Sequence, residues 1–374
     1  ATIVPWEMYE TYGDIRILKK CYDMMKKWVE YQNSTDRRNY GVRTVDGKEV
    51  PEQSDLATIP YIQVQQCRGD HLTYDNSTPY IYSATAYAAH SADILRRTAY
   101  ILGKTDDEKR YTELFENIKR AFNDAWVNDD GSVSYYGEVS SQTAHCGESV
   151  ALDGSVTRYT YYAENTPHCP SQTAYALAVD FDLIPQDKLK NTRKYFKNSI
   201  LRNNGKLTVG FLGISHLAPA LSKVGLDDVA FKLLEQEDNP SWLYSVKNGA
   251  TTIWERWNSY IAETGTFGDV SMNSFNHYSY GAIGQWFFTD ILGIRPVEFG
   301  YKSFMLAPKF GGGLTYAKGS FTSPYGKISS AWKLHDGKFT YDCTVPTNTT
   351  ATLKLPNGDI HTLVGGSYLF EFNV

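Results

Sequence analysis

The sequence lacks the long apolar runs and the basic clusters that would assign it to a membrane or to a nucleic acid. No apolar stretch approaches the roughly 20 residues that a membrane-spanning helix needs. The formal net charge is −5, and no block of Lys and Arg occurs of the kind that nucleic-acid-binding domains carry. We therefore expect neither a membrane nor a nucleic acid among the partners of this protein.

Cysteine is scarce and irregularly placed. The five residues are Cys21, Cys67, Cys146, Cys169 and Cys343, and an odd number leaves at least one thiol without a partner in the same chain. We expect the five to be mostly reduced and structural. The spacing Cys-x-x-Cys does not occur, so the sequence indicates no zinc site, and we expect neither a metal nor a cofactor.

The start of the chain lacks both an initiator Met and a recognisable signal peptide. Ala1 runs almost at once into a predicted helix. We interpret the chain as a fragment or a processed product, so the missing signal does not decide between the cytoplasm and an exported location.

Aromatic side chains are abundant by contrast. They make up 14% of the chain, with 28 Tyr and 8 Trp among them. Tyr and Trp combine an apolar body with a polar tip, so this composition favours a hydrated site for a flat ligand.

One stretch places a carboxylate between two indole side chains. Trp254 and Trp257 flank Glu255, with Arg256 beside it. The two indoles share a face if the segment is helical and lie on opposite faces if it is extended. Flat apolar walls around one carboxylate suit a sugar ring. The alternative is that the Trp pair belongs to the core and that Glu255 and Arg256 form a surface ion pair.

Apolar residues recur at helical spacing through most of the chain and at strand spacing near its end. We predict about nine helices, joined mainly by short connections. They span Pro5–Tyr12, Ile15–Tyr31, Pro79–Leu102, Asp106–Trp126, Ser171–Phe181, Gln186–Asn203, Leu212–Val224, Leu226–Gln236 and Ser274–Leu292. Arrays of helix pairs stack into solenoids or close into toroids.

Alternating short runs begin after Pro296 and predict a small antiparallel β-domain. Its strands are expected at Phe304–Leu306, Gly313–Phe321, Lys327–Leu334, Lys338–Val345, Thr350–Leu355 and Tyr368–Phe372. Asp336-Gly337 and Asn357-Gly358 have the composition of hairpin turns. The predicted domains are therefore a helical one over 1–295 and a β-domain over 296–374.

Two long polar excursions interrupt the helices, and such segments are often functional. The first covers 32–78 and contains Asp70 and His71, which we interpret as a rim group, with a turn or capping role for Asp70 as the alternative. The second covers 127–167 and contains His145, Cys146 and Glu148, but the sequence identifies no base to activate a nucleophile there.

Several motifs, in the right order along the whole chain, resemble the bacterial α-L-rhamnosidases of glycoside hydrolase family 78. They are Pro5–Tyr9 with Tyr12–Asp14, Asn239–Tyr244, Gly249–Asn258, Ser274–Tyr278 with Gly281-Ala282, and Ala307-Pro308 with Gly319-Ser320. The resemblance implies an (α/α)6 barrel followed by a β-sandwich. It also implies that terminal α-L-rhamnose is removed from rhamnose-containing oligosaccharides or glycosides with inversion at the anomeric carbon.

The resemblance also assigns roles to individual residues. Glu255 matches the general base of the family, and His277 matches a histidine that contacts the sugar. Trp6 resembles one of the aromatic walls. Asp70 and His71 stand where many relatives have Gly-Asp-Trp, so the Trp of that wall is replaced here by His71.

The general acid of the family is expected in a segment upstream of the position of Pro5, and no such segment occurs here. We therefore expect a chain that lacks the first barrel helices, and that self-associates or pairs with the missing portion through exposed apolar faces. Two other functions stay open at this point. One is a module that binds a rhamnose-containing glycan without cleaving it, and the other is a helical-toroid glycosidase with a different sugar specificity.

Overall fold

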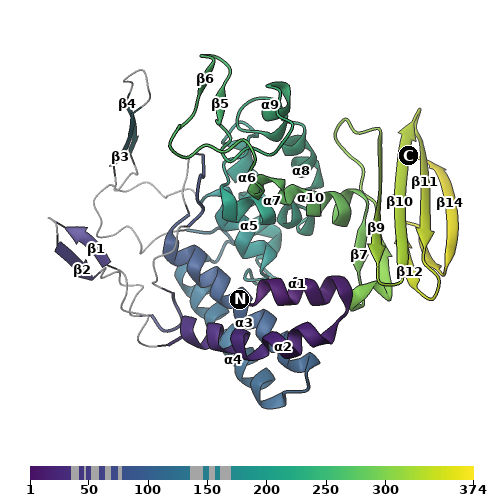
Figure 1. Cartoon of the computed structure of the whole chain (residues 1–374), viewed down its shortest axis with the longest axis horizontal. Helices are drawn as coiled ribbons and strands as arrows, with labels where there is room; N and C mark the ends of the chain where they lie inside the picture. The colour runs from purple at the N-terminus through teal and green to yellow at the C-terminus, as the bar shows by residue number, and fades with distance from the viewer. Residues whose placement is uncertain are drawn as a thin grey trace.

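The computed structural model describes residues 1–34, 42–45, 48–51, 59–63, 69–74, 78–134, 146–150, 156–160 and 170–374. Helices dominate up to residue 291, and strands dominate from 294 onwards, so the chain forms a helical domain with a β-domain beside it (Figure 1). None of the described helices is long and apolar enough to cross a membrane.

Most of the helices follow one another as neighbours joined by short connections. They are α1 (Ile3–Tyr12), α2 (Ile15–Gln32), α3 (Tyr80–Ile101), α4 (Thr105–Trp126), α5 (Gln172–Asp180), α6 (Leu189–Leu201), α7 (Phe211–Lys223), α8 (Asp227–Leu234), α9 (Trp242–Lys247) and α10 (Ile283–Trp286). Gly13 ends α1 in the left-handed conformation, and the Asp14 side chain accepts a hydrogen bond from the first turn of α2. The chain can therefore reverse direction within two residues.

The helices differ in how much of their surface is buried, and this difference sorts them into two layers. α2 and α4 each bury one apolar stripe, such as Tyr111, Phe115, Ile118 and Phe122 of α4. The Ala-rich α3 and the short α5 are buried over most of their length. Helices that are apolar all round lie in the interior of a fold. α3 and α5 therefore form an inner layer that the amphipathic helices cover.

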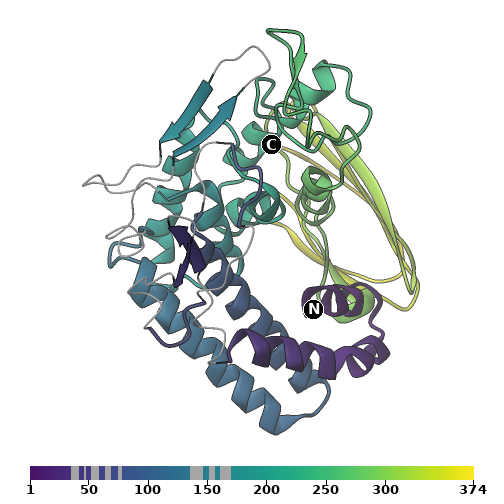
Figure 2. The same ribbon diagram turned by 60° about the vertical axis from the view of Figure 1, so that its left-hand side comes forward.

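α1 occupies the boundary between the helical and β-domains. It packs on α3 on one side and on Phe299–Tyr301 on the other, a turn between the first two strands of the β-domain (Figure 2). Val4, Met8 and Tyr12 share one face of α1 and are exposed. Whether this face supports the expected self-association stays a prediction.

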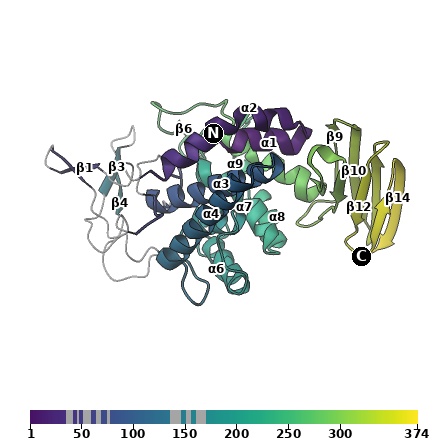
Figure 3. The same ribbon diagram turned by 90° about the horizontal axis from the view of Figure 1, so that it is seen from below.

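The β-domain consists of two four-stranded sheets that lie at one end of the molecule (Figure 3). One sheet has the order β14 (Gly366–Asn373), β11 (Lys338–Val345), β10 (Gly326–His335) and β9 (Tyr316–Ser323). The other has the order β13 (Ile360–Leu363), β12 (Thr350–Lys354), β8 (Ser303–Leu306) and β7 (Ile294–Pro296). The structure adds β7 and β13 to the predicted strands and confirms both Gly-containing hairpins.

The prediction that the β-domain is wholly antiparallel is wrong at one position. β12 pairs with β8 in parallel, with Ala351 opposite Phe304. Between β8 and β12 the chain passes through β9, β10 and β11, which belong to the other sheet. The connection from β8 to β12 is therefore a crossover. A crossover allows parallel pairing, whereas a hairpin does not.

The final predicted helix is also shorter than expected. Residues 274–278 are not helical, and only Ser279–Ala282, α10 and Phe287–Ile291 form helical turns of three different types. The reason is that the backbone groups of Ser274 and His277 are hydrogen-bonded to another segment of the chain. The helix α9, by contrast, was not predicted at all.

Two of the five cysteines, Cys21 and Cys343, are free thiols, and Cys343 is fully buried. Cys67 and Cys169 lie outside the described residues, and so does the side chain of Cys146. The structure therefore supports the structural role expected for Cys343 only.

Candidate active site

The stretch that contains Glu255 is held by direct backbone pairing with the stretch that contains His277. The N–H of Glu255 donates to the carbonyl of Ser274 at 2.8 Å, and the N–H of His277 donates to the carbonyl of Ile253 at 2.8 Å. The two segments are about twenty residues apart in sequence. This short irregular ladder brings the predicted base and the predicted sugar-binding histidine together.

The carboxylate of Glu255 is fixed by one further bond. The backbone N–H of Ser274 donates to its Oε2 at 2.7 Å. The side chain is half-buried, and within the described part of the chain no second donor reaches the carboxylate. One oxygen is therefore oriented by the protein while the other is left for a water molecule or a ligand.

The imidazole ring of His277 lies between two aromatic rings. It stacks on Phe211 with 5.0 Å between ring centroids and on Tyr278 with 5.2 Å between centroids. Its Nδ1 accepts a hydrogen bond of 3.3 Å from the N–H of Ser279. A neutral imidazole with Nδ1 as acceptor carries its proton on Nε2. His277 therefore presents Nε2–H as a donor.

Phe211 is the contact that the predicted site residues share. Besides His277, its ring makes edge-on contacts with His71 and with Tyr280, each with 5.5 Å between centroids. The sequence analysis missed Phe211. From the sequence alone, a Phe at the start of a helix is indistinguishable from any other residue expected in the core. The Gly210 before it was the only local signal of a close approach.

Asp70 lies beneath the N-terminus of α7 and has the capping role that was the alternative interpretation. Its carboxylate accepts hydrogen bonds from the N–H groups of Gly210, Leu212 and Gly213 at 2.9, 2.8 and 3.0 Å, and from the hydroxyl of Thr173. An acidic group stabilises the exposed N–H groups at a helix start. Burial raises the pKa of Asp70, and these four hydrogen bonds oppose that rise.

His71 follows Asp70 and continues the same connection. Its carbonyl accepts a 2.9 Å hydrogen bond from the N–H of Phe211, and the Tyr280 hydroxyl donates to the carbonyl of Leu72 at 3.3 Å. The connection between residues 70 and 72 therefore positions the aromatic cluster of His71, Phe211, His277 and Tyr280, which we call the Phe211 cluster.

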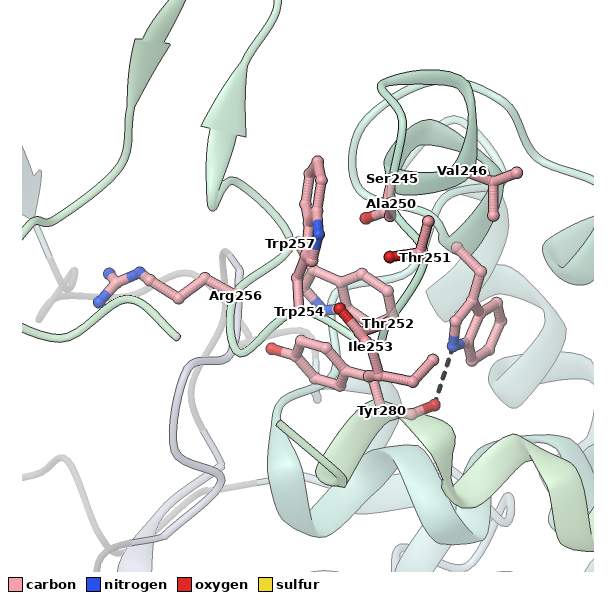
Figure 4. A pocket seen from close by; sticks show the side chains of 11 residues that line it. Ser245, Val246, Ala250, Thr251, Thr252, Ile253, Trp254, Arg256, Trp257 and Tyr280 are labelled. Carbon is pink, nitrogen blue, oxygen red and sulfur yellow. Dashed lines mark hydrogen bonds between the residues drawn. The ribbon is translucent and has the colours of Figure 1, made fainter. Parts of the chain in front are cut away.

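The structure does not place Trp254 and Trp257 as walls around Glu255. The Trp257 ring lies flat on Tyr280, with 3.8 Å between centroids and 13° between planes, and its Nε1–H donates to the carbonyl of Val209. The Trp254 ring packs edge-on against Phe275. Both indoles are buried and line a pocket of about 250 Å³ that includes neither Glu255 nor His277 (Figure 4).

Arg256 and Trp6 also have partners outside the Phe211 cluster. The guanidinium of Arg256 points away from the Trp-lined pocket, toward Asp269 at 3.5 Å, so it does not form the surface pair with Glu255 (Figure 4). Trp6 is buried at the domain boundary, edge-on to Phe299, with the Arg97 guanidinium 4.3 Å over its ring. We therefore leave Trp6 out of the site that we propose.

Among the described residues, no group of three or more His, Cys, Asp or Glu is placed to hold a metal ion. His145 and the side chain of Glu148 lie outside the described residues.

Comparison with known proteins identifies the family. The bacterial α-L-rhamnosidase 6 hairpin glycosidase domain matches residues 1–291, and the bacterial α-L-rhamnosidase C-terminal domain matches residues 293–369. The chain belongs to the bacterial α-L-rhamnosidase family. This result confirms the resemblance and the predicted fold class, a helical toroid of hairpins followed by a β-domain.

Individual relatives agree with this assignment. An α-L-rhamnosidase of Formosa agariphila is 34% identical over 97% of this chain and 34% of its own length. The crystal structure of a Streptomyces avermitilis α-L-rhamnosidase complexed with L-rhamnose matches with a TM-score of 0.80 and 31% identity, over 100% of this chain and 32% of that one. An α-L-rhamnosidase structure from Dictyoglumus thermophilum gives a TM-score of 0.78 at 25% identity, over 100% of this chain and 39% of that one. The chain spans about a third of the length of these relatives.

Proposed function

We propose that this chain carries the sugar-binding and water-activating part of an α-L-rhamnosidase site that removes terminal α-L-rhamnose with inversion. The observation that supports the proposal best is the pairing that holds Glu255 beside His277. Membership of the rhamnosidase family supports the sugar, since a relative of known structure was solved with L-rhamnose.

In this proposal Glu255 is the general base. The hydrogen bond from Ser274 fixes Oε2, so that Oε1 accepts a proton from a water molecule. That water attacks the anomeric carbon, the bond to the leaving oxygen breaks on the opposite face, and the released sugar has the inverted configuration. A carboxylate held by backbone hydrogen bonds needs little reorganisation before it takes the proton.

His277 and its aromatic neighbours would bind the sugar. Nε2–H of His277 is a donor for a ring hydroxyl, because Nδ1 is occupied by Ser279. The Phe211 cluster provides apolar surface for the C–H face and the methyl group of a deoxyhexose. His71 takes the position at which relatives are expected to have a Trp, so we propose a smaller wall there.

The proposal assigns no general acid among the described carboxylates. An inverting glycosidase needs an acid about 6.5–9.5 Å from the base. Asp70 does not meet this need, because its oxygens are buried and accept four hydrogen bonds from the protein. Burial raises the pKa of Glu7, and its charged neighbours include His216 and Asp180, so we do not assign it as the acid paired with Glu255.

Hydrolysis of 4-nitrophenyl α-L-rhamnoside tests the base. Its leaving group hardly needs protonation, so turnover should survive a weak or missing acid. We expect Glu255→Gln to reduce turnover by about 10²–10⁴-fold, and Glu263→Gln, on the exposed hairpin nearby, to leave it unchanged. Proton NMR should show β-L-rhamnose as the first product. Release of the α-anomer, or full activity in Glu255→Gln, would remove Glu255 from this role.

The same measurements separate the other two functions. Saturable binding of L-rhamnose with no turnover of any aryl rhamnoside would indicate a glycan-binding module. Turnover of a different aryl glycoside, at least tenfold faster than that of the rhamnoside, would indicate another sugar specificity.

A further inference from the structure

The Trp-lined pocket lies behind the segment that carries Glu255 and belongs to no role discussed so far. It forms between α9, the loop 250–254 and Tyr280 (Figure 4). Glu255 does not line it, although the residues on both sides of Glu255 do. The main lining side chains are Trp242, Val246, Thr251, Ile253, Trp254 and Trp257. Val246, Thr251 and Ile253 are exposed, so the pocket opens to solvent.

The chemistry of the lining suits a neutral ligand with one apolar face and several hydroxyl groups. Three indoles provide the walls. The hydroxyls of Ser245 and Thr251 turn toward the Trp254 and Trp257 rings (Figure 4). Within the described part of the chain no acceptor reaches Trp254 Nε1–H, which adds a donor. Among the residues that the structure describes, Arg256 is the only charged one in the lining, and its guanidinium is directed away (Figure 4).

The size of the pocket limits the ligand to about one ring. Pockets for drug-sized molecules occupy roughly 300–1,000 Å³, and this one has about 250 Å³. Because no carboxylate of the described residues lines it, this part of the chain supplies no base or acid to a glycoside bound there. A ligand that enters is therefore held without being cleaved.

We propose that this pocket is a second, non-catalytic binding site for a neutral pyranose, coupled to the segment that bears Glu255. The coupling rests on the proposed function of Glu255 and His277. Ile253 contributes its side chain to the pocket while its carbonyl accepts the hydrogen bond from His277 N–H. Thr252 lines the pocket and donates to the carbonyl of Phe275, next to Ser274. A ligand in the pocket therefore restrains the Ile253 end of the ladder that positions the base.

Two sources can supply a neutral pyranose: free L-rhamnose, or a second residue of the glycan whose terminal residue occupies the site at Glu255. Free sugar would give two binding events per chain, one at each site. A glycan that bridges both sites would bind once per chain, and more tightly, because the second contact is then intramolecular.

Fluorine NMR of the 374-residue chain labelled with 5-fluorotryptophan tests the pocket directly, with L-rhamnose as the probe. The Trp242 resonance, assigned through Trp242→Phe, should shift and saturate with its own dissociation constant. Val246→Trp fills the mouth and should weaken this response at least tenfold. Val364→Trp is the matched control, since Val364 and Val246 are 61% and 59% exposed, and it should change nothing. Thr251→Val, which removes one hydroxyl without adding bulk, should weaken binding about threefold.

Calorimetry on the same samples counts the sites. We expect two events for L-rhamnose, one removed by His277→Ala and the other by Val246→Trp. A rhamnose-terminated disaccharide should give one tighter event if the glycan bridges the sites, and two if free sugar is the source. If the Trp242 chemical shift stays fixed while the His277-dependent site saturates, the proposal of a second binding site is wrong, and the proposed function is unaffected. A Trp242 response that persists when neither His277→Ala nor Glu255→Gln affects binding or turnover would overturn the proposed function instead.

Discussion

The carboxylate of Asp70 lies beneath the first turn of α7, where the N–H of Leu212 donates to its Oδ1 at 2.8 Å. The two residues are 142 positions apart. The buried side chain of Asp70 thus links the connection 70–72 to α7. The first residue of α7, Phe211, contacts the rings of His71 and His277. The position of the groups that we propose to bind the sugar therefore depends on a residue whose own carboxylate accepts hydrogen bonds from the protein.

Asp70→Asn should lower the free energy of unfolding, and its effect on the affinity for L-rhamnose should be smaller. The amide replaces one acceptor oxygen with a donor that faces backbone N–H groups. We expect a loss of about 2–4 kcal/mol in the free energy of unfolding, measured with urea, because hydrogen bonds to a charged group contribute about 1.5–3 kcal/mol. Asp269→Asn, in an exposed turn, should cost far less. Unchanged stability with a lost affinity for L-rhamnose would make Asp70 a direct sugar ligand.

Gly210→Ala should disturb the same junction. A Cβ at this position would lie 2.2 Å from the carbonyl oxygen of His71 and 2.7 Å from that of Asp70, and both are backbone atoms. We expect a loss of about 1–3 kcal/mol, as overpacking typically causes. Gly284→Ala in α10 meets nothing within 4 Å and should be neutral or stabilising by up to about 1 kcal/mol. Equal melting temperatures for the two variants would contradict the close approach.

Phe211→Leu should weaken the binding of L-rhamnose while the fold is retained. The substitution removes the ring on which His277 stacks, and aromatic pairs contribute about 0.5–1.5 kcal/mol beyond the area that they bury. We expect a dissociation constant about 3–10-fold higher, measured by calorimetry. Phe310→Leu in the β-domain is the control for the loss of a ring, and equal affinities in the two variants would separate Phe211 from the site.

The sequence predicts the parts of the fold whose signals are local. Three such signals agree with the structure: the helical spacing of apolar residues in α2 and α4, the Ala-rich run of α3, and the turn sequence Asp336-Gly337. The boundaries of these elements agree with the prediction to within a few residues. Residues 274–278 do not follow their local pattern, because their backbone pairs with 253–255, and a window of neighbours contains no information on that pairing.

The site shows the same division. We assign roles to Glu255 and His277 because they belong to recognisable motifs, and their proximity in the structure was not predictable from spacing. The indoles of Trp254 and Trp257 were assigned to the sugar because they flank Glu255 in sequence. In a turn that is neither helix nor strand, neighbours in sequence need not share a face, and here they line a separate pocket. Phe211 became visible only through its contacts.

The boundary between the domains contains a charge network around the buried Asp290 that should respond to Lys309→Met. Lys309 Nζ lies 3.1 Å from the buried Asp290 and 2.7 Å from Asp227 of α8. Breaking a buried pair is costly, but Arg295 remains on Asp290, so we expect a loss of about 1–3 kcal/mol. Lys338→Met, in an exposed pair with Glu371, should cost less than about 1 kcal/mol. Urea unfolding followed at the Trp residues measures both, and equal losses would contradict the network.

His90 should make the helical domain unstable in acid. Its ring stacks on Phe181 at 4.1 Å between centroids, and burial lowers the pKa of His90 from 6.5 to about 4. Between these two values the unfolded chain binds more protons than the folded chain, so stability falls as the pH falls. Its full contribution is present above pH 6.5.

We therefore expect His90→Gln to flatten the pH dependence of the free energy of unfolding between pH 7 and pH 4, which for one such group amounts to about 3 kcal/mol. Urea unfolding at four pH values in this range measures the effect. His335→Gln, at an exposed histidine of the β-domain, should leave the curve unchanged. Parallel curves for the native chain and His90→Gln would mean that the ring accepts its proton without cost, and this prediction would then be wrong.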